Sequence, residues 1–203
     1  MRKMMAQTGI CLLIAVCFWC GSLLSDRQRL REELIRLHVV ANSDNQQDQI
    51  LKLKVRDAVN SSLQNGLAEL KDVQKAREYI QKNLVYIEEV AVSALREMGC
   101  EDSVKATLCQ ERFGTRVYDT FTLPAGVYQS LRIIIGDGEG ENWWCVVFPS
   151  FCIPTASEEM ENVAQAAGFP EALQGALVGE AGYELRFWML DALGRMENML
   201  FGG

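Results

Sequence analysis

The residues with the clearest potential for binding chemistry are two adjacent tryptophans, Trp143 and Trp144, which follow an acidic glycine loop. Consecutive residues of a strand point to opposite faces of a sheet. We therefore expect one indole to enter the core while the other meets solvent or a partner. Exposed tryptophans anchor protein interfaces and stack on sugars. The pair predicts a binding surface, with burial of both rings by sheet and helices as the structural alternative.

The loop before the tryptophans, residues 136–140, alternates glycine with acidic residues. A dinucleotide site needs a helix after such glycines, because the helix N-terminus holds the pyrophosphate. An apolar, strand-like run follows here instead. Calcium takes clustered carboxylate oxygens, which Asp137, Glu139 and Glu141 could supply, but the rest of an EF-hand loop is missing. We expect a solvated hairpin loop in which glycine supplies positive φ.

Four cysteines lie beyond the N-terminal segment. Cys145 and Cys152 are the better candidates for a disulfide because the chain can turn at Pro149, and closing so short a loop stabilises a fold by about 2.5 kcal/mol. Cys100 and Cys109 fit a disulfide and unpaired, buried thiols equally well. The spacings are not those of zinc ribbons or knuckles, so we expect no metal.

His38 is the only histidine, so a Ser-His-Asp or Cys-His site would have to use it. It lies on the polar side of an alternating segment, and the chain holds neither Gly-x-Ser-x-Gly nor His-Glu-x-x-His. We expect a histidine on the surface of a strand. No pair of carboxylates stands out as an acid and a base. The sequence thus predicts no catalytic residues and no cofactor.

The N-terminus has the pattern of an export signal. Arg2 and Lys3 precede an almost uninterrupted apolar run from Gly9 to Leu24. No clean Ala-x-Ala site follows, although Ser22 or Ser25 could end a signal peptide. Residues 1–25 are therefore either a signal peptide or an uncleaved anchor. Residues 26–33 are strongly charged, and we expect a tether or a short solvated helix there.

The charge balance excludes some partners. The chain carries 20 Lys and Arg against 27 Asp and Glu, a net charge of −7. Nucleic-acid affinity comes largely from basic residues that neutralise phosphates, so we expect no nucleic acid. Docking on an anionic membrane surface is disfavoured for the same reason. Any membrane contact would run through an uncleaved N-terminal segment, and the expected partner is a protein or a neutral ligand.

The remainder, residues 34–203, predicts one α+β domain with a mostly antiparallel sheet and several packed helices. Apolar residues alternate from Leu34 to Ala41, which predicts a half-buried strand. Ser43 and Gln46 form a capping-box pattern for a helix that ends near residue 65. A second helical region runs from an Asp72 N-cap to residue 99, with a candidate break at Asn83.

Later segments are predicted from period-two patterns and turn residues. We expect strands at 103–108, 115–122, 128–135 and 143–148, then weak helical pieces within 155–180. A last strand over 183–188 and a helix over 189–201 close the chain. Asn42, Ser43, Asp44 and Arg56 form a second candidate patch, although helix capping alone explains the first three.

Two blocks resemble the stage II sporulation protein R family of endospore-forming bacteria. The first is residues 35–44, Ile-Arg-Leu-His-Val-Val-Ala-Asn-Ser-Asp, continued by Asp48-Gln49 and by residues 53–59, Leu-Lys-Val-Arg-Asp-Ala-Val. The second is Pro124-Ala125-Gly126-x-Tyr128, Leu131-Arg132-Ile133, the glycines at 136, 138 and 140, and Asn142-Trp143-Trp144-Cys145-Val146 with Phe148-Pro149 and Cys152. The resemblance covers residues 34–153, and residues 154–203 are a variable region. Ser150 and Phe151 depart from the family pattern, at the turn between the two cysteines.

The resemblance implies a signalling protein and not an enzyme. Such proteins are made in the forespore and exported into the space between the forespore and mother-cell membranes. There they are needed to activate a membrane-embedded aspartic protease, which cuts the precursor of the mother-cell sigma factor E. We expect this chain to act in the same way and place.

The partner surface is a hypothesis built on the densest motif. Trp143 and Trp144, with Asp137, Glu139 and Asn142 beside them, would form or support the surface that the protease reads. Two other classes of protein compete with this interpretation. A secreted carbohydrate- or cell-wall-binding module would also use exposed tryptophans, and a secreted hydrolase would need a nucleophile or metal.

Overall fold

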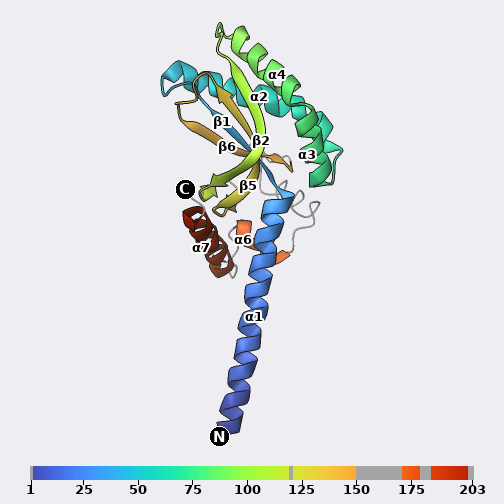
Figure 1. Ribbon diagram of the computed structural model, residues 1–203, viewed down its shortest axis with the longest axis vertical. Helices are drawn as coiled ribbons and strands as arrows, with labels where there is room; N and C mark the ends of the chain where they lie inside the picture. The colour runs from blue at the N-terminus through green and yellow to red at the C-terminus, as the bar shows by residue number, and fades with distance from the viewer. Residues whose placement is uncertain (1, 119–120, 150–170, 179–183, 201–203) are drawn as a thin grey trace.

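The computed structural model describes residues 2–118, 121–149, 171–178 and 184–200. A long helix, α1 (Arg2–Glu33), stands out as a stalk, and the other elements gather around and beyond its C-terminal end (Figure 1). The α+β class with a mostly antiparallel sheet is confirmed. The predicted helical pieces within 155–170 lie outside the described residues.

Four strands form the main sheet in the order β2-β5-β1-β6. They are β1 (Ile35–Val40), β2 (Val104–Phe113), β5 (Gly126–Ile135) and β6 (Asn142–Phe148). β1 runs parallel to β5 and antiparallel to β6, while β2 is antiparallel to β5. The predicted strand at 103–108 is longer than expected, because pairing with β5 extends it to Phe113. The predicted strand at 115–122 is instead two short strands, β3 (Arg116–Val117) and β4 (Thr122–Leu123), paired with each other.

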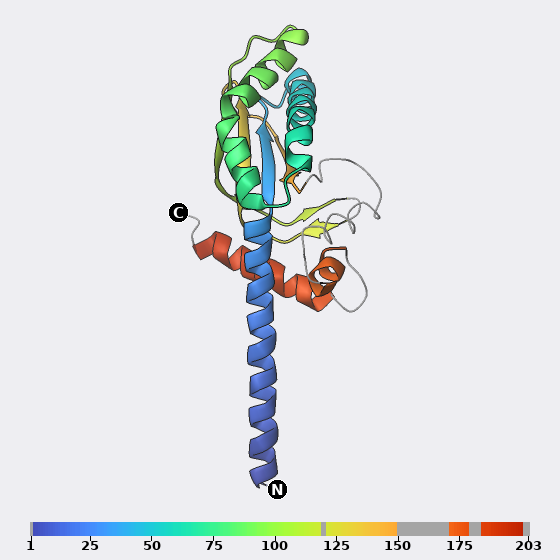
Figure 2. The ribbon, with the colours of Figure 1, turned by 90° about the vertical axis from the view of Figure 1, so that its right-hand side faces the viewer.

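Three helices cover one face of the sheet: α2 (Gln46–Ala68), α3 (Val73–Lys82) and α4 (Leu84–Glu97) (Figure 2). Their apolar stripes pack on the inward residues of the strands in the larger core cluster. Asp72 caps α3 and Asn83 divides α3 from α4, as predicted. The N-cap of α2 is Asn45 and not Ser43, because the Asn45 side chain accepts a hydrogen bond from the Asp48 backbone.

A second apolar cluster lies against the lower part of the other sheet face and the end of α1. It joins α1 to the small sheet and to α6 (Glu171–Val178) and α7 (Glu184–Leu200). The strand predicted over 183–188 is wrong: the described part of it, from Glu184, forms the first turns of α7. Leu185 and Trp188 stay exposed, whereas Leu190 and Gly194 turn inward on helical spacing. Contacts with α1 and β5 stabilise the helix there.

Of the two expectations for residues 26–33, the helix is confirmed and the tether is wrong, and the helix is only partly solvated. These residues continue α1 without a break, and Leu30 is buried in the second cluster. Asp26 is only 3% exposed and forms an ion pair with Arg186 of α7. Arg31 Nη1 lies 3.0 Å from Glu197 Oε1, and Arg27 pairs with the same carboxylate. The charges that indicated a solvated segment are neutralised by a helix far along the chain.

Candidate functional site

Two loops meet at the end of the sheet that lies away from α1. Because β1 is parallel to β5, the loop after β1 and the loop between β5 and β6 emerge at the same end. The Glu139 and Gly140 backbone amides donate to the Asn42 and Ala41 carbonyls at 3.1 and 2.9 Å. The Asp137 amide donates to Asn42 Oδ1 at 2.9 Å. The two candidate patches are therefore one surface, which we call the paired-loop surface (residues 42–44 and 136–142).

Polar side chains lock the two loops together. Asp44 Oδ1 accepts a hydrogen bond from the Glu141 amide at 2.7 Å. Lys52 Nζ, from α2, donates to the Glu141 carbonyl at 3.0 Å. Ser43 Oγ and Asn42 Nδ2 both donate to Asp48 Oδ2. These bonds, that of Ser43 foremost, hold the pKa of Asp48 below its usual range against the opposing effect of burial.

The alternating glycines allow this close approach. Gly136 and Gly138 have φ of 55° and 68°, as the expected hairpin loop requires. Gly140 lies so close to the first loop that a Cβ atom there would stand 2.3 Å from the Ser43 carbonyl oxygen. The motif is thus explained by packing between loops, and the acidic side chains of Asp137 and Glu139 are left exposed on the surface.

Trp143 lies on the helix-covered side of the sheet. Its ring is half-buried against the larger core cluster. The Arg56 guanidinium carbon sits 4.3 Å from the ring centroid, a cation–π geometry. Arg56, from the first motif block, and Trp143, from the second, are therefore in contact. Among the described residues the indole Nε1 has no hydrogen-bond acceptor, although it is buried.

Trp144 points to the opposite face, as the strand pattern predicts. It stacks on His38 with ring centroids 3.8 Å apart and meets the edge of Phe113 at 4.8 Å. The Arg116 guanidinium lies 5.1 Å from its centroid. The expectation that one tryptophan enters the core while the other meets solvent is wrong, because both are half-buried, one on each face.

His38 was expected on the surface and is instead buried, with 5% of its area exposed. Its Nδ1 lies 3.1 Å from Glu111 Oε1, and its Nε2 lies 2.7 Å from Asn142 Oδ1. Glu111 also pairs with Arg132 Nε at 3.4 Å. All of β1 is buried. The face that carries His38 is covered by side chains from the neighbouring strands and by the Trp144 ring.

Glu111 is held as an anion in this cluster. Burial raises the pKa of its carboxyl, but the hydrogen bond from His38, the Ser130 hydroxyl and the charges of His38 and Arg132 bring the pKa below the usual range. Both nitrogens of His38 are engaged, so neither is free to take a proton from a nucleophile. No three potential metal-ligating side chains converge within the described ranges. The geometry suits an interaction surface that the buried hydrogen bonds and ion pair of this cluster hold in place.

Sequence reasoning missed the roles of His38, Glu111 and Arg132. The available signal was the period-two pattern, which continues beyond residue 108 to place Glu111 and Phe113 on one face of β2. The register across β2, β5 and β1 then brings the three side chains together. That register depends on the parallel pairing of β1 with β5. These strands are far apart in the chain, so the hydrophobic pattern of either strand alone does not predict their pairing.

The cysteine predictions have different outcomes. Cys152 lies outside the described residues, so its pairing with the buried Cys145 stays a prediction. Cys100 and Cys109 are both free, and the disulfide alternative for them is wrong. Burial raises the pKa of both thiols, which keeps them protonated near neutral pH.

We expect Gly140→Ala to lower the free energy of unfolding by about 1–3 kcal/mol, because the added methyl group would push the two loops apart. Gly114→Ala is the matched control, since a Cβ atom there meets nothing within 4 Å. Thermal unfolding of the detergent-solubilised full chain, followed by tryptophan fluorescence, measures both. Equal unfolding temperatures for the two variants would contradict the close packing of the loops.

We expect Glu111→Gln to lower the free energy of unfolding by about 1–3 kcal/mol at pH 7, because it removes the anion that faces His38 and Arg132. The depressed pKa of Glu111 means that its contribution is complete above the unfolded carboxyl pKa and is lost as pH falls through the folded value. The gap between wild type and variant should therefore narrow as pH falls below about 4.

Glu139→Gln is the charge-matched control for this measurement, since Glu139 is exposed. Denaturant unfolding at pH 7, 4 and about 3 would follow all three proteins. A gap between wild type and Glu111→Gln that stays constant with pH would show that the carboxylate charge does not carry the effect.

Comparison with known proteins identifies the family. A family model described as stage II sporulation protein R matches residues 31–158, a range that holds the whole paired-loop surface, both tryptophans, Arg56 and His38. Stage II sporulation protein R of Bacillus subtilis (strain 168) is 36% identical over 121 residues, which are 60% of this chain and 54% of that protein. The alignment thus spans about half the length of that relative, and no solved structure matches the chain significantly. With a family match that extends over more than half of its residues, this chain belongs to the stage II sporulation protein R family.

Proposed function

We propose that this protein is an extracytoplasmic signalling protein of endospore formation and not an enzyme. It activates a membrane-embedded aspartic protease, which then processes the precursor of the mother-cell sigma factor E. Family membership supports the sporulation role. The observation that carries the signalling role is that the two motif blocks, far apart in the chain, build one paired-loop surface with exposed acidic side chains.

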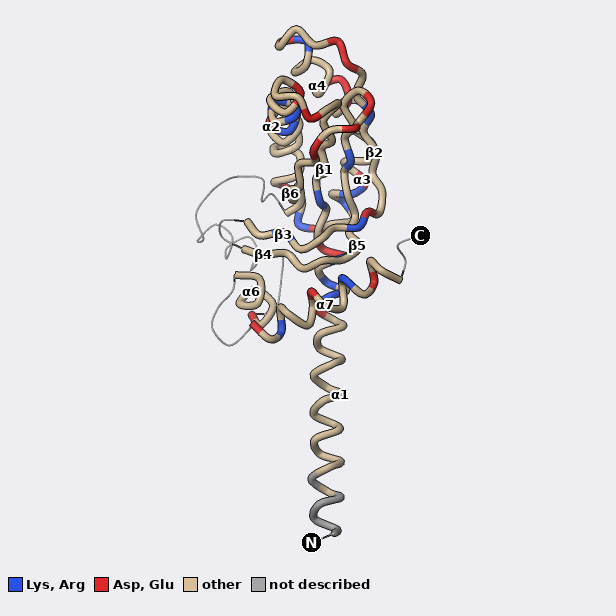
Figure 3. The backbone as a smooth tube through the Cα atoms, turned by 90° about the vertical axis from the view of Figure 1, so that its left-hand side faces the viewer, with Lys and Arg blue, Asp and Glu red and all other residues tan. Residues whose placement is uncertain are grey.

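The exposed groups of the paired-loop surface are those that a protein partner would contact. Asp44, Asp137, Glu139 and Asn142 are exposed, while the hydrogen bonds between the two loops fix their backbone. Acidic residues gather at this end of the domain, away from α1 (Figure 3). Such a rigid acidic surface suits a basic or hydrogen-bonding segment of the protease.

The carbohydrate-binding alternative receives less support. Aromatic rings that stack on sugars need an open face. The Trp144 ring is stacked on His38, and the Arg56 guanidinium covers one side of the Trp143 ring. Both tryptophans support the surface from beneath, and the exposed groups around them are acidic and amide side chains.

We further propose that α1 is retained as a membrane anchor. Within the described residues, α1 is the one helix long and apolar enough to cross a membrane, over Gly9–Glu33. Its end is part of the folded domain: Leu23 is 1% exposed, and Ser22 Oγ accepts a hydrogen bond from Arg186 at 2.8 Å. Cleavage after residue 22 would remove the Ser22 hydrogen bond to Arg186, and cleavage after residue 25 would also remove Leu23 from the second apolar cluster.

The activating role predicts that the paired-loop surface is required for precursor cleavage. We would co-express the exported protein with the protease and the sigma precursor in a non-sporulating bacterium and follow precursor size on a blot. Cleavage should depend on this chain and fall at least about tenfold, equivalent to 1.4 kcal/mol, when Asp137 and Glu139 are both changed to Ala.

The matched control changes Glu89 and Glu97 of α4 to Ala, which removes the same charge from another exposed surface. This control should retain cleavage. Full cleavage by a folded, exported Asp137/Glu139 variant would locate the protease surface elsewhere. Uncut precursor with the wild-type chain would count against the activating role itself.

The anchor proposal predicts that the wild-type chain keeps its full mass and stays in the membrane fraction after an alkaline wash. A variant in which residues 1–25 are replaced by a cleavable signal peptide should be soluble and should unfold at a lower temperature, because it lacks Ser22 and Leu23. Mass spectrometry of the C-terminally tagged protein measures whether residues 1–25 are retained. A wild-type N-terminus near residue 26 would refute retention.

A further inference from the structure

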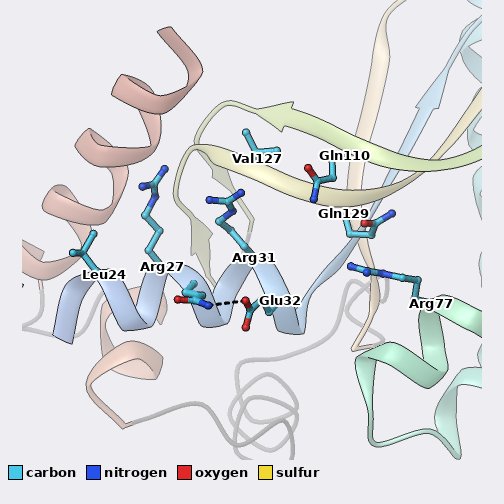
Figure 4. Close-up of a pocket in the computed structure, with 9 residues that line it drawn as sticks. Leu24, Arg27, Arg31, Glu32, Arg77, Gln110, Val127 and Gln129 are labelled. Atoms are coloured by element: carbon cyan, nitrogen blue, oxygen red, sulfur yellow. Dashed lines mark hydrogen bonds between the residues drawn. The ribbon is translucent and has the colours of Figure 1, made fainter. Parts of the chain in front are cut away.

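A polar cavity of about 380 Å³ lies where α1 meets the sheet, remote from the paired-loop surface (Figure 4). Its walls come from the last turns of α1, from α3 and from β2 and β5. Figure 4 shows Arg77 reaching from α3 toward Gln129 of β5, with Arg27 and Arg31 rising from α1. Three guanidinium groups from two helices thus line one cavity, a grouping that the proposed signalling surface does not use.

The cavity has more positive charge than its carboxylates neutralise. Arg27 and Arg31 share the single carboxylate of Glu197. The one carboxylate in the lining, Glu32, accepts a hydrogen bond from Gln28. Three guanidinium groups therefore face two carboxylates, which leaves a local positive surplus in a chain that is acidic overall.

Hydrogen-bond donors in the lining also lack acceptors. Arg27 Nε and Arg77 Nε are buried and have no hydrogen-bond partner among the described residues. Leaving a buried charged donor unpaired is costly. Gln110 and Gln129 add amide groups to the same wall. The complement of such a site is an anion with several oxygen acceptors, and guanidinium groups bind phosphate in this way.

The position of the cavity indicates which phosphate it meets. Leu24, the last apolar residue of the exposed run on α1, lines its lower edge and is 55% exposed. Arg27 and Arg31 follow about 5 and 10 Å further along the helix, at 1.5 Å per residue. The polar layer on each side of the hydrocarbon core is roughly 5–8 Å thick. With α1 in a membrane, Arg27 stands at the level of the lipid headgroups and Arg31 just beyond them, so the cavity opens onto the headgroup layer.

We propose that this cavity binds the phosphodiester of an anionic phospholipid from the membrane that holds α1. The proposal rests on the retained anchor of the proposed function. The phosphodiester oxygens accept from Arg77, while Arg27 and Arg31 add positive charge along the lining, and the guanidinium surplus disfavours the cationic headgroup of phosphatidylcholine. Lipid bound there joins α1, α3 and the sheet. A local basic cavity gives the acidic domain a specific contact with an anionic membrane surface.

The test is native mass spectrometry of the full-length protein released from micelles that contain phosphatidylglycerol and phosphatidylcholine in equal amounts. Wild type should retain phosphatidylglycerol with a preference of roughly tenfold, because the quaternary ammonium of phosphatidylcholine would face the surplus guanidinium charge. Arg77→Gln should abolish this preference, since it removes the guanidinium that contributes from α3. Arg96→Gln, an exposed arginine on α4, is the matched control and should keep it.

Equal retention of both lipids by wild type, or an unchanged preference in Arg77→Gln, would overturn the proposal. Displacement of the lipid by millimolar inorganic phosphate would show instead a site for a soluble anion. The protein mass in the same spectrum reports whether residues 1–25 are present. Failure of the anchor and failure of lipid binding are therefore separate outcomes, and neither involves the precursor-cleavage assay.

Discussion

The position of β1 is the constraint on which the rest of the structure depends. This strand is hydrogen-bonded on both edges, parallel to β5 and antiparallel to β6, and it begins one residue after α1 ends. Leu37 thereby lies between Leu131 and Cys145, in the core under the helices. Because the strand has both edges paired and both faces covered, it fixes at once the end at which the loops meet, the face that receives the helices and the direction of the stalk.

The polar face of β1 shows what this burial requires. Arg36 is fully buried, and burial lowers the pKa of its guanidinium. Its Nε donates to the Cys145 carbonyl at 3.2 Å, its Nη2 donates to the Tyr118 hydroxyl at 2.8 Å, and its Cζ lies 4.1 Å from the Phe113 ring centroid. Two residues further along β1, His38 is held in the same manner by the Glu111 carboxylate, the Asn142 side-chain amide and the Trp144 indole. Cations and polar donors at the centre of the sheet thus tie β2, β6 and the small sheet to one strand.

Local patterns predicted the parts of the fold that depend on local physics. Asp72, Asn83 and the glycine at 99 mark helix ends because capping and left-handed backbone act within a few residues. The errors fall where distant segments decide. Asp26, Arg27 and Arg31 are paired by α7, and the described part of the strand predicted over 183–188, from Glu184, is a helix that packs on α1. For the site, the exposed acids and the opposed tryptophans followed from alternation, whereas the union of the two patches and the burial of His38 required the β1–β5 register.

The single residue between α1 and β1, Leu34, leaves no room for a hinge, and it is itself buried. Six residues of strand, about 20 Å at 3.3 Å each, then separate the end of the stalk from the paired-loop surface. If α1 is retained in a membrane as proposed, a domain joined so stiffly to it cannot tumble, and it carries the surface at a fixed height and tilt as it diffuses laterally. Its search for a partner across a narrow gap is two-dimensional, and much of the rotational freedom that association normally removes is already absent. Under the proposed function, the width of the gap between the two membranes would then be a condition for contact with the protease.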